Sequence, residues 1–195
     1  ESVTIAIRGT WGSGERLAEP RVKIRGVVRN DVHNHLDPGA VKRGDHVGLI
    51  SDNRREWFVA DLATLSLGAA DVPRGRDAMP YELAFILSVT ETAVCFAENA
   101  EQTQKILDLK EKLPALKTLV VMDEEYQSGS IADVAGISIV RFGDLLVQGA
   151  AYNKEHKDFF DTSITAGKSQ DIATVIFTSG TTGEPKGVML SHRNM

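Results

Sequence analysis

Short apolar runs separated by longer amphipathic stretches dominate the chain from about residue 45 onward. Four of the runs have the length and composition of buried strands: HVGLIS (46–51), GAADVP (68–73), AVCFA (93–97) and KTLVVMD (117–123). A fifth, ATVIFTS (173–179), leads directly into a glycine-rich segment. Because helical segments of about 10–15 residues separate the first four strands, the pattern predicts parallel pairing with right-handed crossovers. The expected fold is α/β, with parallel-sheet layers and flanking helices.

The first two predicted helices carry recognisable N-terminal signals. Asn53 followed by Glu56 is typical of a capping box, in which both side chains meet free backbone N–H groups. The helix after it is expected to bury one apolar stripe, made of Phe58, Leu62 and Leu65. Pro80 suits the first position of the next helix. The inward side chains predicted for that helix are Leu83, Ile86 and Leu87.

The later segments are less regular. Residues 100–113 predict a helix that ends at Pro114. Its apolar face is expected to hold Ile106, Leu109 and Leu113, and its solvated face Lys105, Lys110 and Lys112. Between 124 and 168 the pattern loosens, with a helix predicted at 141–150 and a polar loop at 164–171.

The composition narrows the classes of function. A formal charge of −5 and a pI near 5.6 argue against general nucleic-acid binding, which needs a basic face to neutralise phosphates. No apolar run approaches the roughly 18–20 residues that cross a bilayer. The N-terminus also lacks the charged start and apolar stretch of a secretory signal. The single cysteine, Cys95, lies in an apolar strand and is interpreted as a packed core residue, not a nucleophile.

The segment TSGTTGEPKG (178–187) has the chemistry of a phosphate cradle. Its glycines let the backbone approach a ligand closely, and N–H groups in such turns converge on an anion. Its hydroxyl groups and Lys186 suit a polyphosphate. It is not a Walker A loop, because Glu-Pro-Lys follows Gly183 and no Ser or Thr follows Gly187. Its place after a buried strand is where ligands dock in α/β sheets.

The longer run IFTSGTTGEPKGVMLSHRN (176–194) resembles the phosphate-binding signature of the adenylate-forming (AMP-binding) superfamily of acyl-CoA synthetases, luciferases and peptide-synthetase adenylation domains. Three stretches are similar to long-chain acyl-CoA synthetases: 44–73, 81–99 and 109–123. The resemblance implies that 41–195 is part of the large N-terminal domain of such an enzyme, ending just after the phosphate-binding loop. Residues 1–40 do not match and are treated as an atypical N-terminal segment.

The resemblance also implies a reaction. A fatty acid carboxylate attacks ATP to give an acyl-adenylate and pyrophosphate, and coenzyme A then displaces AMP. The residues implied to hold the β- and γ-phosphates are Ser179, Gly180, Thr181, Thr182, Gly183 and Lys186. Lys186 and Thr181 are the implied catalytic residues, and Thr178 the implied residue that helps to place Mg²⁺. A fatty acid substrate places the protein in the cytosol or loosely on a membrane surface, and the long-chain preference rests on 44–99.

Two other hypotheses stay open. The family's later elements, including a Glu for Mg²⁺ and a C-terminal lysine, do not lie in this chain, so the chain alone is expected to be inactive. A non-catalytic nucleotide-binding pseudoenzyme is therefore one alternative. The other is a metal-dependent amidohydrolase, because His33 and His35 in DVHNHLDPG resemble its first metal motif. Exposed loop histidines are the preferred interpretation of that pair.

Several other residues receive structural interpretations. Arg74, Arg76 and Asp77 are expected in a solvated turn. Trp57 is expected in the core, and His192 is expected to cap or pack near the start of a following helix.

Overall fold

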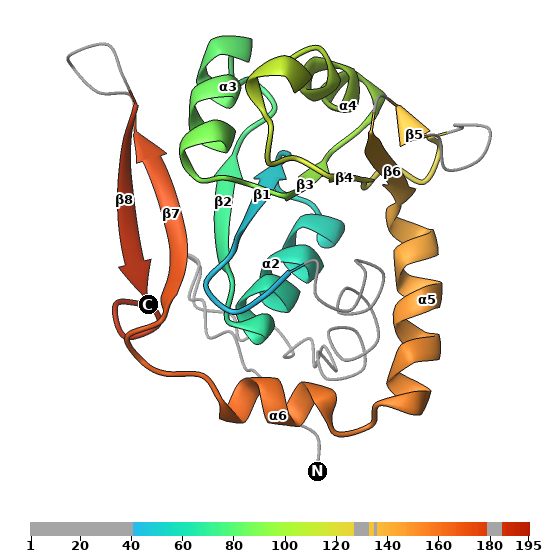
Figure 1. Cartoon of the computed structure of the whole chain (residues 1–195), viewed down its shortest axis with the longest axis vertical. Helices are drawn as coiled ribbons and strands as arrows, with labels where there is room; N and C mark the ends of the chain where they lie inside the picture. The colour runs from blue at the N-terminus through green and yellow to red at the C-terminus, as the bar shows by residue number, and fades with distance from the viewer. Residues whose placement is uncertain (1–40, 127–132, 135, 179–184) are drawn as a thin grey trace, which may run out of the picture.

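The computed structural model describes residues 41–126, 133–134, 136–178 and 185–195, and its strands form one eight-stranded sheet (Figure 1). The order across the sheet is β5-β6-β4-β3-β1-β2-β7-β8. The strands are β1 (His46–Ile50), β2 (Ala70–Arg74), β3 (Val94–Ala97), β4 (Thr118–Val121), β5 (Asp133–Val134), β6 (Ile137–Arg141), β7 (Ile172–Thr178) and β8 (Lys186–Ser191). The α/β prediction is confirmed, and each predicted strand is present. The predicted boundary between 1–40 and 41–195 concerns residues outside the described ranges.

The inner strands pair in parallel, β1 with β2 and β3 and β3 with β4 as expected. β4 also pairs in parallel with β6, and β2 with β7. Both edges are antiparallel, with β5 on β6 and β8 on β7. The sequence pattern does not predict these edges. At each edge the two strands follow one another along the chain, and a short connection can join only antiparallel strands.

Helices cover both faces of the sheet. They are α2 (Arg55–Leu67), α3 (Pro80–Val89), α4 (Ala100–Leu107), α5 (Phe142–Glu155) and α6 (Phe159–Thr165), with a 3₁₀ turn at Lys110–Lys112. One core cluster joins α2 and α5 to a face that carries Leu49 and Phe96. The second joins α3 and α4 to the face that carries Cys95 and Leu119. Figure 1 shows α3 and α4 together at the top and α2, α5 and α6 below them.

Helix α2 differs from its prediction in two ways. It begins at Arg55 after an N-cap at Arg54 that makes no side-chain cap bond, so the capping box at Asn53 is wrong. Its buried face is Val59, Ala60, Ala63 and Thr64, not the predicted stripe. Phe58 is 39% exposed, whereas the small side chains of Ala60 and Ala63 are fully buried. Leu62 of the predicted stripe is partly buried against the core. Trp57 packs at the edge of the core, as predicted.

Helices α3 and α4 confirm most of their predictions. Pro80 is the first residue of α3, and the Glu82 carboxylate accepts a hydrogen bond from the Met79 N–H at 2.9 Å. The three predicted inward residues of α3 are fully buried. In the next segment Ile106 is fully buried, and Leu109 and Leu113 are only slightly exposed. α4 ends earlier than predicted and a 3₁₀ turn continues it. Lys105 is partly exposed, and its ammonium also donates to the carbonyl of Arg76 at 3.0 Å.

The loosely patterned region contains more structure than the sequence predicts. The predicted helix at 141–150 is α5, which extends to Glu155. Strands β5 and β6 and helix α6 are not predicted, and α6 takes the first two residues of the predicted loop. Among the described helices, none is long and apolar enough to cross a membrane.

Candidate phosphate-binding site

The antiparallel hairpin of β7 and β8 carries the glycine-rich segment between its strands. Thr178 is the last residue of β7 and Lys186 the first of β8, and the two are partners in the ladder. Both side chains are exposed at this end of the hairpin. Lys186 was expected in the loop, but it continues the ladder, so its backbone is held by strand pairing. No ion pair joins its ammonium to another described residue.

Aromatic packing supports the loop end of this hairpin. Gly187 lies over Phe177, and a Cβ on Gly187 would come within 3.0 Å of the phenyl ring. The ring of Phe177 in turn meets Phe85 of α3 edge to face, with centroids 6.4 Å apart. Glycine fits position 187 because a larger side chain would require the rings and side chains of β7 to shift.

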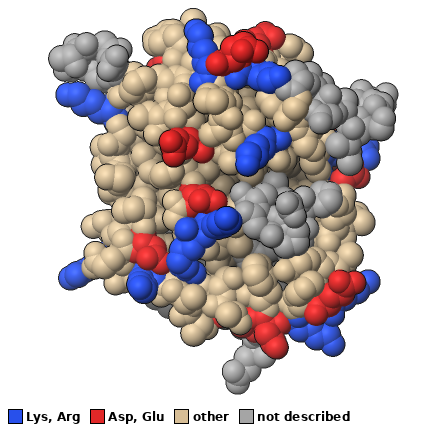
Figure 2. Space-filling model, in the orientation of Figure 1, with Lys and Arg blue, Asp and Glu red and all other residues tan. Residues whose placement is uncertain are grey.

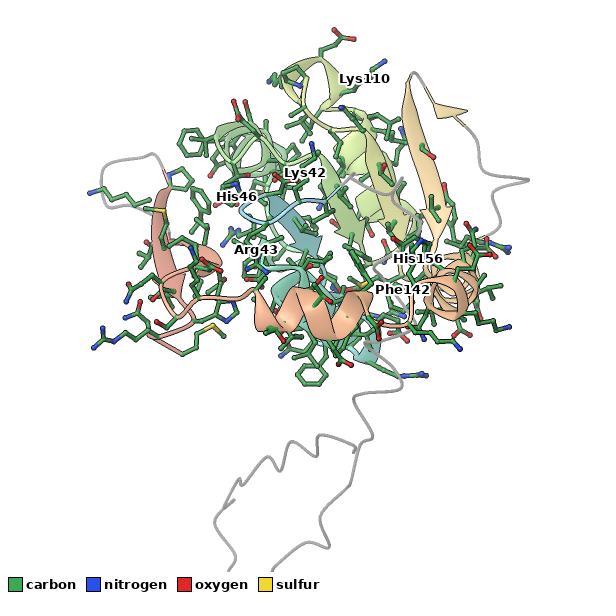
Figure 3. The ribbon with its side chains drawn as sticks, turned by 60° about the horizontal axis from the view of Figure 1, so that its bottom comes forward. Lys42, Arg43, His46, Lys110, Phe142 and His156 are labelled. Atoms are coloured by element: carbon green, nitrogen blue, oxygen red, sulfur yellow. The ribbon has the colours of Figure 1, made fainter. Side chains whose placement is uncertain are left out.

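The start of β7 is anchored by an arginine. Arg43, just before β1, donates from Nη1 to the Asp171 carboxylate at 2.7 Å and from Nη2 to the carbonyl of Ser163 at 2.8 Å. Figure 3 shows Arg43 beside α6. The Lys168 backbone N–H also donates to Asp171, and this bond, with the Arg43 guanidinium, holds the pKa of the carboxyl below its usual range. Both ends of β7 are thus tied to other elements.

A second group of polar side chains lies where the strand order reverses. The chain runs from β1 to β2 on one side and then to β3 on the other, and the carboxyl ends of strands at such a switch point commonly bind ligands. Here Glu98 accepts from the Asp52 N–H at 2.7 Å and from the Ser51 hydroxyl at 3.2 Å. Arg76 pairs with Asp52 at 2.8 Å and with Glu98 at 3.6 Å. The two carboxylates of Asp52 and Glu98 outnumber the single guanidinium of Arg76. The ion pairs join the loops that follow β1, β2 and β3, and the excess of negative charge does not favour a phosphate ligand.

The solvated turn predicted around residue 75 is therefore only partly correct. Arg74 belongs to β2 and pairs with Glu82 at 3.1 Å, so its prediction is wrong. Arg76 is 57% exposed but ion-paired, and Asp77 is exposed as expected. On the face shown in Figure 2, positive and negative side chains alternate, and no patch of one sign dominates.

A third polar group lies inside the fold, where β2 meets β7. Asp71 of β2 is the ladder partner of Thr174, and both are buried. Asp61 of α2 hydrogen-bonds to Asp71. Burial, followed by the charge and hydrogen bond of Asp71, raises the pKa of Asp61 to about 7. The sequence analysis missed this group, although an aspartate inside the apolar run GAADVP was a visible signal.

A comparison with known protein families identifies the family of this chain. The family described as AMP-binding enzyme matches residues 31–195. The chain belongs to this family. Fatty acyl-CoA synthetase B of Dictyostelium discoideum is 30% identical over 156 residues, which are 80% of this chain and 22% of that protein. Peroxisomal long chain acyl-CoA synthetase 6 of Arabidopsis thaliana is 30% identical over 171 residues, which are 87% of this chain and 23% of that protein.

Solved structures agree with this assignment to the AMP-binding enzyme family. The anthranilate CoA ligase AuaEII in complex with anthranoyl-AMP superposes with a TM-score of 0.62 at 24% identity, covering 87% of this chain and 28% of that one. A red-emitting luciferase from Phrixothrix hirtus gives 0.63 at 20% identity, covering 88% and 30%. These neighbours show that the fold is that of adenylate-forming enzymes, as the sequence predicted. The chain spans less than a quarter of the length of the two curated relatives.

The structure describes two of the predicted phosphate-binding residues, Thr178 and Lys186. Ser179, Gly180, Thr181, Thr182 and Gly183 lie outside the described residues. Cys95 is fully buried and its burial raises the thiol pKa, which confirms its interpretation as a core residue.

The histidines that the structure describes, His46, His156 and His192, do not gather into a metal site. His33 and His35 lie outside the described residues. His156 stacks on Tyr152 with centroids 3.7 Å apart, and His192 is exposed in a turn after β8. Its backbone N–H donates to the carbonyl of Asp171 at 3.0 Å. Its predicted role at the start of a following helix stays a prediction. No cluster of acidic, His or Cys side chains fit for a metal occurs among the described residues.

Proposed function

We propose that the protein activates a long-chain fatty acid in two steps. In the first, a carboxylate oxygen attacks the α-phosphorus of ATP, the bond to the bridging oxygen breaks, and pyrophosphate leaves. In the second, the thiol of coenzyme A attacks the acyl carbon, loses its proton, and expels AMP. The names of the relatives, a fatty acyl-CoA synthetase and a long chain acyl-CoA synthetase, support this class of substrate.

One observation supports the assignment of the ATP site more than any other. The hairpin presents Thr178 and Lys186 as its last ladder pair, both exposed, at the two ends of the hydroxyl-rich segment. A lysine with no described ion pair keeps its charge available for the β- and γ-phosphates. Strand pairing fixes its backbone, which reduces the reorganisation needed when negative charge develops on the leaving pyrophosphate. In this proposal Ser179, Gly180, Thr181, Thr182 and Gly183 supply the remaining hydroxyl and backbone donors.

The residues also fit a magnesium ion that arrives with ATP. Mg²⁺ prefers oxygen ligands and is commonly held by few protein groups together with substrate phosphates. The Thr178 hydroxyl is an exposed oxygen that no described residue hydrogen-bonds. The bound ion would neutralise phosphate charge, while Thr178 would supply one oxygen to it.

The test is ATP–pyrophosphate exchange by the full-length protein, with a panel of fatty, aryl and amino acids. We predict exchange with long-chain fatty acids and a loss of tens-fold or more in Lys186→Ala, which corresponds to about 2–4 kcal/mol for a preorganised electrostatic contact. Lys117→Ala is the matched control, because that exposed lysine precedes β4 far from the hairpin.

Three outcomes contradict parts of the proposal. Unchanged exchange in Lys186→Ala would remove this lysine from the ATP site. Exchange with aryl or amino acids alone would replace the substrate class. ATP binding without any exchange would favour the non-catalytic pseudoenzyme.

A further inference from the structure

Two aspartates meet inside the fold, away from the hairpin loop. Asp71 is 3% exposed, in a strand that pairs with β1 on one side and β7 on the other. Asp61 is half-buried on α2 and hydrogen-bonds to it. A buried ionised carboxylate without a compensating cation is costly, so the pair requires an explanation.

Hydrogen bonding does not compensate both carboxylates. Oδ1 of Asp71 and Oγ1 of Thr174 are buried and lack partners of good geometry. The Thr174 hydroxyl lies near enough to lower the pKa of Asp71, but burial outweighs this effect and the pKa is raised. The only direct bond between the acids is the one from Asp61 to Asp71, and one of the two must carry a proton to make it.

No cation among the described residues compensates the pair either. The charged groups on the packed elements are Arg55 and Glu56 of α2, His46 of β1, Arg74 of β2 and Asp161 of α6, while β7 has none. Arg74 is paired with Glu82, and Arg43, beside α6, is paired with Asp171. Among described residues, no ion pair reaches Asp61 or Asp71.

We propose that Asp61 and Asp71 share one proton, and that this proton is a pH-sensitive contact between α2, β2 and β7. Two adjacent carboxyls in a buried place cannot both ionise cheaply, so the first proton is lost easily and the second is retained. Loss of the second proton places two negative charges at the contact. Because Thr174 is the ladder partner of Asp71, the repulsion acts where β7 is attached to the sheet.

The direction of the pH effect follows from the raised pKa of Asp61, about 7 against an ordinary 3.8. Between these values the folded protein holds a proton that the unfolded chain has lost. Stability therefore falls as pH rises from about 4 to about 7 and stops falling above that range. In Asp61→Asn the amide replaces the protonated acid as donor and does not titrate. We expect its melting temperature at pH 8 to exceed that of the native protein and its decline between pH 4 and pH 7 to be smaller.

Thermal unfolding of the full-length protein from pH 4 to pH 8 tests this proposal without ATP. Asp158→Asn is the control, because this exposed aspartate precedes α6 and makes no side-chain cap bond, so it should leave the decline unchanged. An equal decline in native protein and Asp61→Asn would overturn the shared proton. Sodium or potassium ions that raise the melting temperature of the native protein, but not of Asp61→Asn, would also overturn it by replacing the proton with a cation.

A second measurement does not depend on the variant being folded. In ¹³C NMR of aspartate carboxyl carbons, the native protein should show one resonance that titrates near pH 7. If all aspartates titrate near their ordinary values, the proposal is wrong.

The consequence for the loop rests on the proposed function and has its own test. If β7 loosens above pH 7, the KM for ATP in pyrophosphate exchange should rise there in the native protein and less in Asp61→Asn. An equal KM profile in the two proteins, with the stability difference present, would overturn the link to the loop but keep the shared proton. Absence of exchange in both would contradict the proposed function instead.

Discussion

At the scale of single residues, close contacts decide more than residue type does. The sequence does not distinguish Gly187 from Gly143. In the structure Gly187 lies against the ring of Phe177, whereas a Cβ at position 143 would have no neighbour within 4 Å. The sequence predicts that Gly187 belongs to a ligand loop. The structure adds that its hydrogen side chain lets β8 pack on β7, which is a requirement of the hairpin itself.

Gly187→Ala should therefore destabilise the protein by about 1–3 kcal/mol, because the methyl group must displace a ring held between two elements. Urea unfolding measures the change. The matched control is Gly143→Ala in the first turn of α5, where alanine meets open space and should gain up to about 1 kcal/mol from its higher helix propensity. Equal effects in the two variants would show that Gly187 is not close-packed in solution.

At the scale of elements, helix ends and strand starts are joined by contacts that the linear pattern does not contain. Gly68 ends α2 in the left-handed conformation, with φ 72°, and its N–H donates to the carbonyl of Leu65 at 3.0 Å. The guanidinium of Arg43 lies directly against it and reaches on to Asp171 before β7. The end of α2 and the start of β7 therefore depend on one arginine.

Gly68→Ala should cost more stability than Gly44→Ala, although both glycines have positive φ, 72° and 86°. At Gly44 the methyl group meets nothing, so only the backbone penalty of roughly 1–2 kcal/mol applies. At Gly68 it also displaces Arg43 from Asp171. Thermal melts of the two variants and of Arg43→Ala/Gly68→Ala measure this. Equal losses in both single variants would show that the arginine contact contributes nothing.

At the scale of the whole molecule, two helical layers enclose the inner strands. Cys95 lies in β3 between β1 and β4 and has no exposed surface. It is the only cysteine of the chain, so its reactivity reports the opening of this core.

We predict that a thiol reagent labels Cys95 in the native chain slower by orders of magnitude than in denaturant, because burial hides the sulfur and raises its pKa. The labelling rate in increasing urea should follow global unfolding measured by circular dichroism. Fast labelling under native conditions would mean that the central sheet opens locally.

The sequence alone determined the fold class, the strands β1, β2, β3, β4 and β7, the buried faces of α3 and α4, the core position of Cys95 and the family. These features follow from local hydrophobic periodicity and from one long motif, and both depend only on residues that are close together along the chain. The tertiary structure decided the antiparallel edges, the inward face of α2, the pairing of Arg74, the tether at Arg43 and the meeting of Asp61 with Asp71. Each of these depends on distances between segments far apart along the chain. The spacing of apolar residues predicts which side chains are buried, but it does not predict which residues they contact in the folded protein.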